Sequence, residues 1–210
     1  MKLIGMLDSP YVRRVAVSLQ LLGLKFEHQS LSVFRTYDQF RELNPVVKAP
    51  TLLDEEGVPL MDSTLILQYA EYIARPSLRR TPTMPTELWR SQRLLGLALA
   101  ACDKAVQLVY ERELRPAEKL HQPWADRVIQ QLRAALAVLE AEQLQQPLEV
   151  TSDSIAPPGV MLAVTWHFIQ QMLPDVVAPA DYPALAEYSR QAEALPEFRA
   201  APHCDGTYQG

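Results

Sequence analysis

Two short serine-containing motifs in the sequence have the residue types to bind an anion. Ser9 stands directly before Pro10, and Asp62-Ser63 stands directly before an apolar run that begins at Thr64. Ser and Asp are favoured N-cap residues, and proline is favoured at the first helical position. The N–H groups and the dipole of a helix N-terminus attract negative charge, so these motifs could hold a thiolate or a carboxylate. Plain N-capping, with no chemical role, is the alternative for both.

The elements that would position these motifs alternate between strand and helix. Apolar runs predict strands at 2–7, 26–31, 50–54 and 58–61, and the last two form a β-hairpin around Glu55-Glu56-Gly57. Helices are predicted from Pro10 to about Leu22, where Gly23 is a stop signal, and then over 37–43 and 64–74. The order β-α-β-α-β-β-α therefore fills the first 75 residues.

The rest of the chain has helical signals alone. Prolines at 76, 82 and 85 mark a linker, and 87–114 could form one long helix. The run 160–172 is apolar nearly all round, which predicts a central, buried helix. Two further helices are indicated by apolar stripes at helical spacing, which are Val128, Leu132, Leu136 and Leu139 in one and Leu185, Tyr188, Ala192 and Leu195 in the other.

Composition excludes several classes of protein. The 210 residues are 48% hydrophobic and 21% charged, which is typical of a globular chain. The net charge of −5 contains no block of like charges, so neither nucleic acid nor an anionic membrane is indicated as a partner. The longest apolar stretch is too short to span a bilayer, and the start does not resemble a signal peptide. Two cysteines do not make a disulfide framework, so a reducing, cytoplasmic location is expected.

Metal and nucleotide chemistry are not indicated either. His28, His121 and His203 are scattered, with no second histidine or cysteine at ligand spacing. His167 lies in the apolar run and is interpreted as a core histidine. The seven glycines form neither a dinucleotide fingerprint nor a phosphate loop. We therefore expect no metal.

The motifs in this order resemble the cytosolic glutathione S-transferases, over nearly the whole chain and with a serine-type active site. The resemblance rests on Ser9-Pro10-Tyr11-Val12-Arg13-Arg14-Val15, on 44–52 (NPVVKAPTL) and on 62–69 (DSTLILQY), with support from Trp166-His167-Phe168 and 182–185. It implies a thioredoxin-like α/β domain at 1–76, which binds glutathione. It also implies an all-helical domain at 86–210 with a pocket for an electrophile, and a homodimer.

The resemblance implies a role for each motif. Ser9 would donate a hydrogen bond to the glutathione sulfur and favour the thiolate. A cis Ala49–Pro50 bond would let Ala49 pair its backbone with the cysteinyl part of glutathione, whereas the alternative is an ordinary trans proline. Lys48 would reach the glycine carboxylate or remain a solvated lysine. Asp62 and Ser63 would bind the ammonium and the α-carboxylate of the γ-glutamyl group.

Three features complicate these assignments. Asp8 would oppose a thiolate if its carboxylate pointed inward. The family's capping box before its buried helix lacks its acid, because the third residue after Ser154 is Pro157. Tyr110, Trp166 and Asp103 are weaker candidates for the electrophile pocket or for a dimer contact to glutathione.

The resemblance predicts a transferase that conjugates glutathione to small hydrophobic electrophiles. A non-catalytic protein-binding module and a glutathione-dependent isomerase or dehalogenase are the alternatives, because fold alone does not decide function. Thiol–disulfide exchange is disfavoured, since serine cannot form a mixed disulfide. The sequence does not identify the electrophile.

Overall fold

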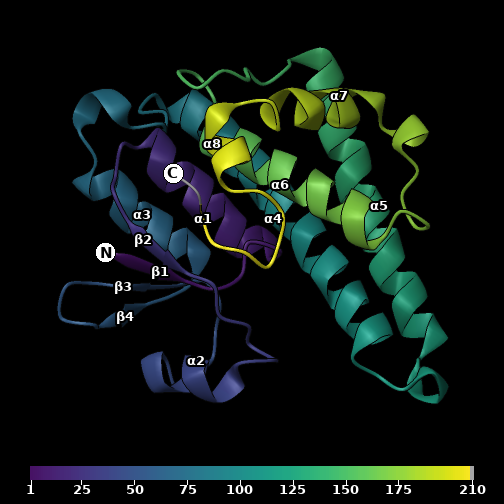
Figure 1. Ribbon diagram of the computed structural model, residues 1–210. Helices are drawn as coiled ribbons and strands as arrows, with labels where there is room; N and C mark the ends of the chain where they lie inside the picture. The colour runs from purple at the N-terminus through teal and green to yellow at the C-terminus, as the bar shows by residue number, and fades with distance from the viewer. Residues whose placement is uncertain (209–210) are drawn as a thin grey trace. The chain divides into compact units, whose positions relative to one another are not determined.

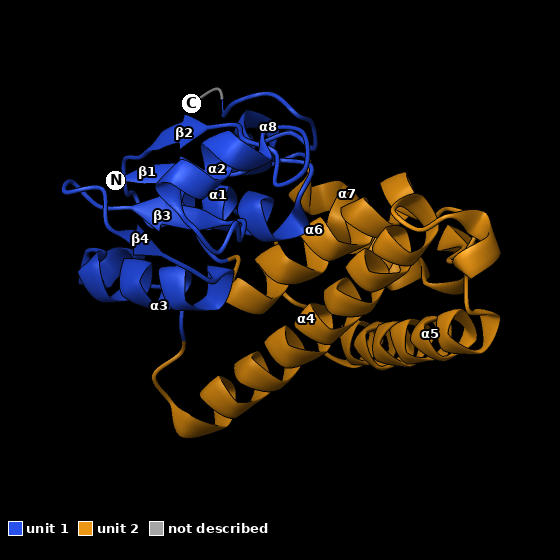
Figure 2. Ribbon diagram, turned by 90° about the horizontal axis from the view of Figure 1, so that it is seen from below, with its two compact units in different colours: residues 1–81, 151–154, 194–210 blue, residues 82–150, 155–193 orange. Residues whose placement is uncertain are grey.

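The computed structural model describes residues 1–208 and confirms the predicted fold class. A four-stranded sheet with flanking helices is followed by a helical region (Figure 1). The chain divides into two compact units (Figure 2). Unit 1 contains residues 1–81, 151–154 and 194–210, and unit 2 contains 82–150 and 155–193. The end of the chain therefore groups with the N-terminal sheet, whereas the sequence assigned everything from 86 to 210 to one helical domain.

The sheet of unit 1 has the strand order β2-β1-β3-β4. Strands β1 (Lys2–Ile4) and β2 (Glu27–Gln29) are parallel, while β3 (Thr51–Leu53) is antiparallel to β1 and pairs with β4 (Pro59–Leu60) as the predicted hairpin. Each strand is shorter than predicted. Strand β1 ends at Ile4 because Gly5, at φ 135°, turns the chain out of the sheet in a conformation that favours glycine.

Helices cover both faces of this sheet (Figure 1). Helices α1 (Pro10–Leu21) and α3 (Ser63–Ile73) pack against each other on one face, and α2 (Tyr37–Leu43) covers the other. Gly23 follows α1 at φ 65°, as its stop signal predicted. Under α2 lies a core cluster of Ile4, Leu31, Phe40 and Leu53. The unit also contains the short helices η1 (Pro76–Leu78) and α8 (Pro196–Ala200).

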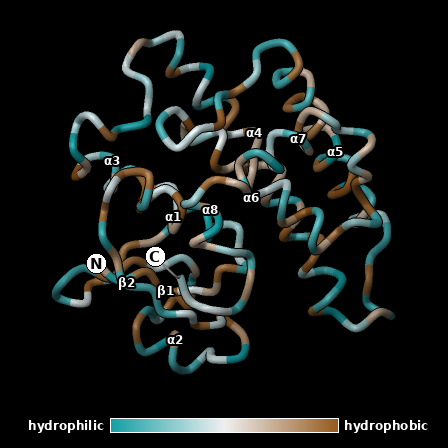
Figure 3. Tube along the Cα trace, turned by 45° about the horizontal axis from the view of Figure 1, so that its top comes forward, coloured by the Kyte–Doolittle hydropathy of each residue, from teal (hydrophilic) through white to brown (hydrophobic). Residues whose placement is uncertain are grey.

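Unit 2 is built from long helices. They are α4 (Pro85–Glu113), α5 (Gln122–Gln145), α6 (Pro157–Met172) and α7 (Pro183–Ala192), with the short turns η2 (Ala117–Lys119) and η3 (Pro179–Asp181). The trace of α5 alternates between hydrophilic and hydrophobic stretches (Figure 3), and its buried residues include the whole predicted apolar stripe. Among residues 1–208, no helix is long and apolar enough to cross a membrane.

The ends of the helices in unit 2 differ from the sequence expectation in two places. Leu195 does not belong to α7, because that helix ends at Ala192 and Leu195 instead precedes α8. The free N–H groups at the N-terminus of α7 are capped by a residue of α5. The buried Glu140 carboxylate accepts from the N–H groups of Ala184 (2.8 Å) and Leu185 (2.9 Å). Helix α6 begins at Pro157 without a side-chain cap, in agreement with the incomplete capping box.

Candidate functional site

Ser9 is the N-cap of α1. Its Oγ accepts a long hydrogen bond from the Val12 N–H, at 3.5 Å, and its backbone is extended. Pro10 occupies the first helical position, as predicted. The side chain is half-buried, so the hydroxyl lies at the surface of unit 1 beside the positive end of the α1 dipole. The structure therefore confirms that Ser9 caps helix α1, and its action on a thiol stays a prediction.

The Ala49–Pro50 bond is cis, as the resemblance implied. Because β1 and β3 are antiparallel, with Ile4 opposite Thr51, the turn after β1 and the turn before β3 meet at one end of the sheet. Gly5 makes the approach close, since a Cβ there would lie 3.2 Å from the Ala49 Cβ and 2.6 Å from a Val12 methyl carbon. The turn that leads to Ser9 and the cis-proline turn are thus neighbours.

A buried asparagine holds the cis-proline turn. Asn44 is 1% exposed, and its Nδ2 donates to the Thr51 hydroxyl at 2.8 Å, while its Oδ1 accepts from the Val46 N–H at 3.0 Å. Thr51 Oγ1 in turn donates to the Lys48 carbonyl at 2.6 Å. Sequence reasoning treated Asn44 as the end of a helix and missed this function. The signal was available as an Asn-Pro step placed before a proline-initiated strand.

The start of α3 differs from the expectation in its details. Asp62 is the N-cap, and its Oδ1 accepts from the Thr64 N–H at 2.9 Å and from the Leu65 N–H at 3.4 Å. Ser63 lies inside the helix and is 2% exposed. Its Oγ accepts from Nη1 of Arg14, at 3.3 Å. The three motifs therefore occupy one region of unit 1, although each contact to glutathione stays a prediction.

Arg14 connects two of these motifs, although the sequence analysis assigned it no role. It lies on α1, is 2% exposed, and donates to both Ser63 and Thr64 on α3. An arginine buried in this way is stable because its donors meet oxygen acceptors. Arg14 thus links the N-terminus of α3 to helix α1 by hydrogen bonds.

Asp8 brings a carboxyl group next to Ser9. Burial raises the pKa of Asp8, while a hydrogen bond from the Ser9 backbone N–H and the charge of Arg35 lower it. The carboxylate of Asp205, near the C-terminus, raises the Asp8 pKa further. The electrostatics of the Ser9 turn are therefore set by charges from three separate parts of the chain. Lys48, the other predicted charge of the site, is exposed.

The weaker candidates are distributed in unit 2. Trp166 is buried and meets Tyr182 edge-on, with ring centroids 6.0 Å apart, so it serves the core. His167 is half-exposed rather than a core residue, and its Nδ1 lies 3.4 Å from the Glu193 carboxylate. Tyr110 and Asp103 are exposed on α4. Among residues 1–208, no group of three His, Cys, Asp or Glu side chains is arranged to hold a metal ion.

Comparisons with known sequences point to one family. Residues 3–77 match the model of the glutathione S-transferase N-terminal domain. The chain is 27% identical over 175 residues to the uncharacterized GST-like protein YibF of Escherichia coli, which covers 83% of this chain and 85% of that protein. It is 31% identical to glutathione S-transferase U7 of Arabidopsis thaliana over 86 residues, which is 41% of this chain and 36% of that protein.

Solved structures agree over nearly the whole chain. A glutathione S-transferase of Methylobacterium radiotolerans, in complex with glutathione sulfonate, matches with a TM-score of 0.85 and 26% identity, covering 95% of this chain and 93% of that one. A glutathione transferase family member of Pseudomonas fluorescens with bound glutathione matches with a TM-score of 0.82 and 29% identity, covering 95% and 97%. Together these similarities support a glutathione S-transferase family.

Proposed function

We propose that the protein is a serine-type glutathione S-transferase that conjugates the glutathione thiolate to small hydrophobic electrophiles. One observation carries this proposal. The Ser9 helix start, the cis Ala49–Pro50 turn and the Asp62-Ser63 helix start occupy one region of unit 1, in a fold whose solved relatives hold glutathione. Residues 1–76 form the glutathione-binding domain in this proposal, and 86–210 supply the electrophile pocket.

Ser9 is the catalytic residue of the proposed reaction. A thiol with a pKa of about 8.5 is only about 3% ionised at pH 7. The Ser9 hydroxyl would donate a hydrogen bond to the sulfur, and the α1 dipole would favour the same negative charge. A pKa lower by about two units, worth about 2.7 kcal/mol, makes the thiolate predominate at neutral pH. The thiol proton passes to solvent water, and the thiolate sulfur attacks the electrophilic carbon. A C–S bond forms while a leaving group such as chloride departs or, in an addition, while the π-electron pair moves to the neighbouring atom and is protonated by water.

The other predicted residues bind the rest of the tripeptide. Ala49 would pair its backbone with the cysteinyl unit, in the way that an added strand pairs with a sheet edge. Asp62 would contact the γ-glutamyl ammonium, and Ser63 would contact the α-carboxylate at the N-terminus of α3. The exposed Lys48 would reach the glycine carboxylate.

Assembly and location belong to the same proposal. We propose a homodimer, and an exposed apolar face of α3 made of Leu65, Tyr69, Tyr72 and Ile73 offers a surface for a second copy. A cytoplasmic location fits a protein whose substrate is a free thiol, because glutathione keeps that compartment reducing.

The test is a glutathione titration by calorimetry, followed by a conjugation assay with a chloronitrobenzene. Saturable binding and conjugation are the expected results. Binding without turnover on a panel of electrophiles would favour a glutathione-dependent isomerase or dehalogenase. If glutathione does not bind, the transferase proposal fails and a protein-binding module becomes the better description.

A further inference from the structure

The C-terminal segment returns to the surface of unit 1 and is anchored there. Arg13 on α1 is 2% exposed, and its Nε donates to the Ala201 carbonyl at 2.7 Å. A second donor of Arg13 reaches the Phe198 carbonyl at 3.4 Å, and its guanidinium lies 5.7 Å from the centre of the Phe198 ring. The chain is therefore fixed at Ala201, and the residues after it, Pro202–Tyr208, are named the strap here.

The strap is fastened along β2 and the segment that follows. The Ser30 hydroxyl donates to the Asp205 carbonyl at 2.6 Å. The Tyr208 N–H donates to Nδ1 of His28 at 2.8 Å, and the Tyr208 ring stacks on Phe26 with centroids 4.7 Å apart. The side chains of Phe26, His28, Ser30 and Tyr208 are all partly exposed, so the strap can detach locally while the sheet stays folded.

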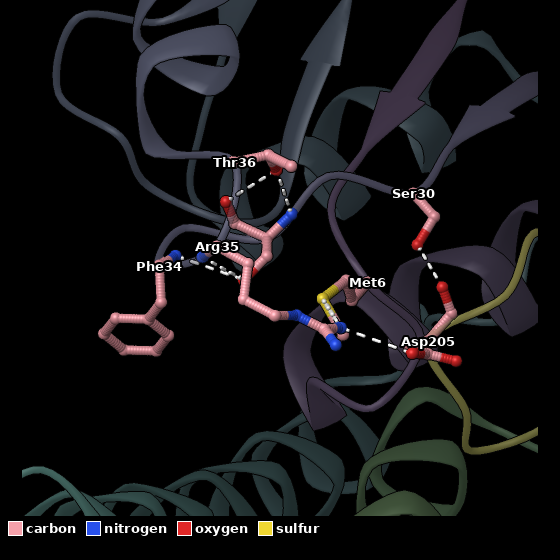
Figure 4. Close-up of polar contacts among 7 residues, drawn as sticks. Met6, Ser30, Phe34, Arg35, Thr36 and Asp205 are labelled. Carbon is pink, nitrogen blue, oxygen red and sulfur yellow. Dashed lines mark hydrogen bonds and ion pairs between the residues drawn. The ribbon is translucent and has the colours of Figure 1, made fainter.

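The strap places a carboxylate on Arg35. Asp205 Oδ2 lies 3.3 Å from Nη2 of Arg35, and the two side chains are 67% and 66% exposed. The same nitrogen lies 3.5 Å from the Met6 sulfur, so the guanidinium stands over the turn that leads to Ser9 (Figure 4). The backbone of Arg35 is fixed by a hydrogen bond, because its N–H donates to the Ser32 hydroxyl at 3.0 Å.

The charges at this turn are unfavourable for an anion while the strap is docked. Arg35 lowers the pKa of the partly buried Asp8 and Asp205 raises it, so both groups are felt at the residue next to Ser9. Two carboxylates then share one guanidinium. Glutathione carries two carboxylates and one ammonium, and its thiolate adds a further negative charge.

We propose that the strap is autoinhibitory: docked, its Asp205 occupies the Arg35 guanidinium next to Met6, in the turn that precedes Ser9, and detached, it leaves that guanidinium to a negatively charged ligand of the site. The proposal rests on the proposed function, because it takes glutathione as that ligand. An exposed ion pair suits this task, since it is weak enough for an anionic ligand to displace.

The test measures glutathione affinity by calorimetry in wild type, Asp205→Asn and Tyr208→Ala. Asp205→Asn keeps an oxygen for Arg35 and deletes the charge, so binding should become about two- to fivefold tighter, the range of one screened surface charge. Tyr208→Ala removes the stacking on Phe26 and should change affinity in the same direction. The gain should shrink at high salt.

Two controls make the result specific. Asp38→Asn makes the same substitution at another exposed aspartate, which pairs with Arg41 at 3.2 Å, and it should leave the affinity unchanged. In an Arg35→Gln background, Asp205→Asn should lose most of its effect. Equal or weaker binding by Asp205→Asn, or a full gain without Arg35, would overturn the strap.

The outcome also separates the two proposals. If wild type binds glutathione and the strap variants bind it equally well, the strap fails and the transferase stands. If neither wild type nor any variant binds glutathione, both fail together.

Discussion

Ser9 offers the sharpest prediction at the scale of single residues. Its Oγ accepts a long hydrogen bond from the Val12 N–H, at 3.5 Å. In the proposed reaction the hydroxyl proton is donated to the glutathione sulfur at the helix start. Ser9→Ala should raise the pKa of bound glutathione and leave its affinity nearly unchanged. The rate at pH 7 should fall about tenfold or more, because one pKa unit corresponds to about 1.4 kcal/mol. A pH titration of thiolate absorbance measures the shift.

Ser9→Thr is the matched control, because threonine keeps both the hydroxyl and the capping ability. The threonine variant should retain a low thiol pKa. Most of the rate lost in Ser9→Ala should return near pH 9, where the thiol ionises without help. Identical titration midpoints in wild type and Ser9→Ala would show that Ser9 is a cap alone.

Ser63→Ala should affect both ligand binding and folding. Ser63 accepts from the buried Arg14, so the variant deprives a buried cation of one acceptor, and such charged hydrogen bonds are worth about 1.5–3 kcal/mol. Glutathione affinity should fall more than the rate of the bound complex, since the γ-glutamyl end is remote from the sulfur. Calorimetry and thermal unfolding measure the two effects. An unchanged dissociation constant in a folded variant would remove Ser63 from the site.

The sequence predicted the residues with local signals and missed those with distant partners. The N-cap of α1 followed from a short motif, and the cis Ala49–Pro50 bond was implied by the family resemblance. Arg14 was missed because its partner is 49 residues away and nothing in the neighbouring residues marks it as buried. Asn44 was missed although its partner is only 7 residues away, because the Asn-Pro step was interpreted as a helix end. Their function depends on tertiary packing, which a local pattern does not contain.

At the scale of elements, the α6–α7 packing depends on a glycine. A Cβ on Gly159 of α6 would lie 2.1 Å from the Tyr188 hydroxyl, which donates to the Glu149 carbonyl at 3.2 Å. Burial raises the Tyr188 pKa, so the group remains a neutral donor. Gly159→Ala should therefore lower the free energy of unfolding by about 1–3 kcal/mol through overpacking. Chemical denaturation measures the change.

Gly96→Ala tests the same substitution in open space. Gly96 lies within α4, and a Cβ there would meet no atom within 4 Å. Alanine should stabilise that helix by roughly 0.8–1 kcal/mol, its advantage in helix propensity. Equal effects at Gly96 and Gly159 would contradict the packing argument.

The attachment of the strap to β2 should depend on pH. His28 Nδ1 accepts from the Tyr208 N–H, so Nε2 carries the proton and donates to the Gly5 carbonyl at 2.7 Å. Burial lowers the His28 pKa from its ordinary 6.5, with a smaller opposing effect from that carbonyl. The neutral form is therefore the docked form. The stability that it contributes is present above about pH 6.5 and is lost as the pH falls toward the lowered value.

The NMR chemical shifts of the Tyr208 amide nitrogen and proton, followed between about pH 8 and pH 5, would report the release of the strap. The charged groups on the elements around His28 are Lys2 and Glu27, which pair at 3.6 Å on the strands, and Asp205 on the strap. His203 is the histidine of the strap itself and serves as the control. His203→Gln should keep the transition and His28→Gln should remove it, whereas the reverse result would contradict the role of His28.

At the scale of the whole molecule, sequence order and spatial grouping disagree. The strand and helix pattern predicted an α/β part followed by a helical part, with the elements in the observed order along the chain, and the family resemblance added the thioredoxin-like fold. It did not predict that residues 194–208 group with unit 1, because no local signal in them identifies the distant residues that they contact. Several of their contacts are with Arg13, His28, Ser30 and Arg35, which lie near the other end of the chain. The division into domains at 1–76 and 86–210 therefore stays a prediction.

The last prediction concerns assembly. On α3, Leu65, Tyr69, Tyr72 and Ile73 follow helical spacing, and Tyr72 is 80% exposed. A contiguous apolar face of this kind is typical of an interface. Light scattering at micromolar concentration should give twice the mass of one chain. Tyr72→Glu should shift the protein toward the mass of one chain, because a charge in the middle of an apolar interface is costly to bury. Tyr37→Glu alters an exposed tyrosine of α2, 48% exposed, and should leave the dimer intact. A wild-type monomer would contradict the homodimer, and a dimer that persists in Tyr72→Glu would place the interface elsewhere.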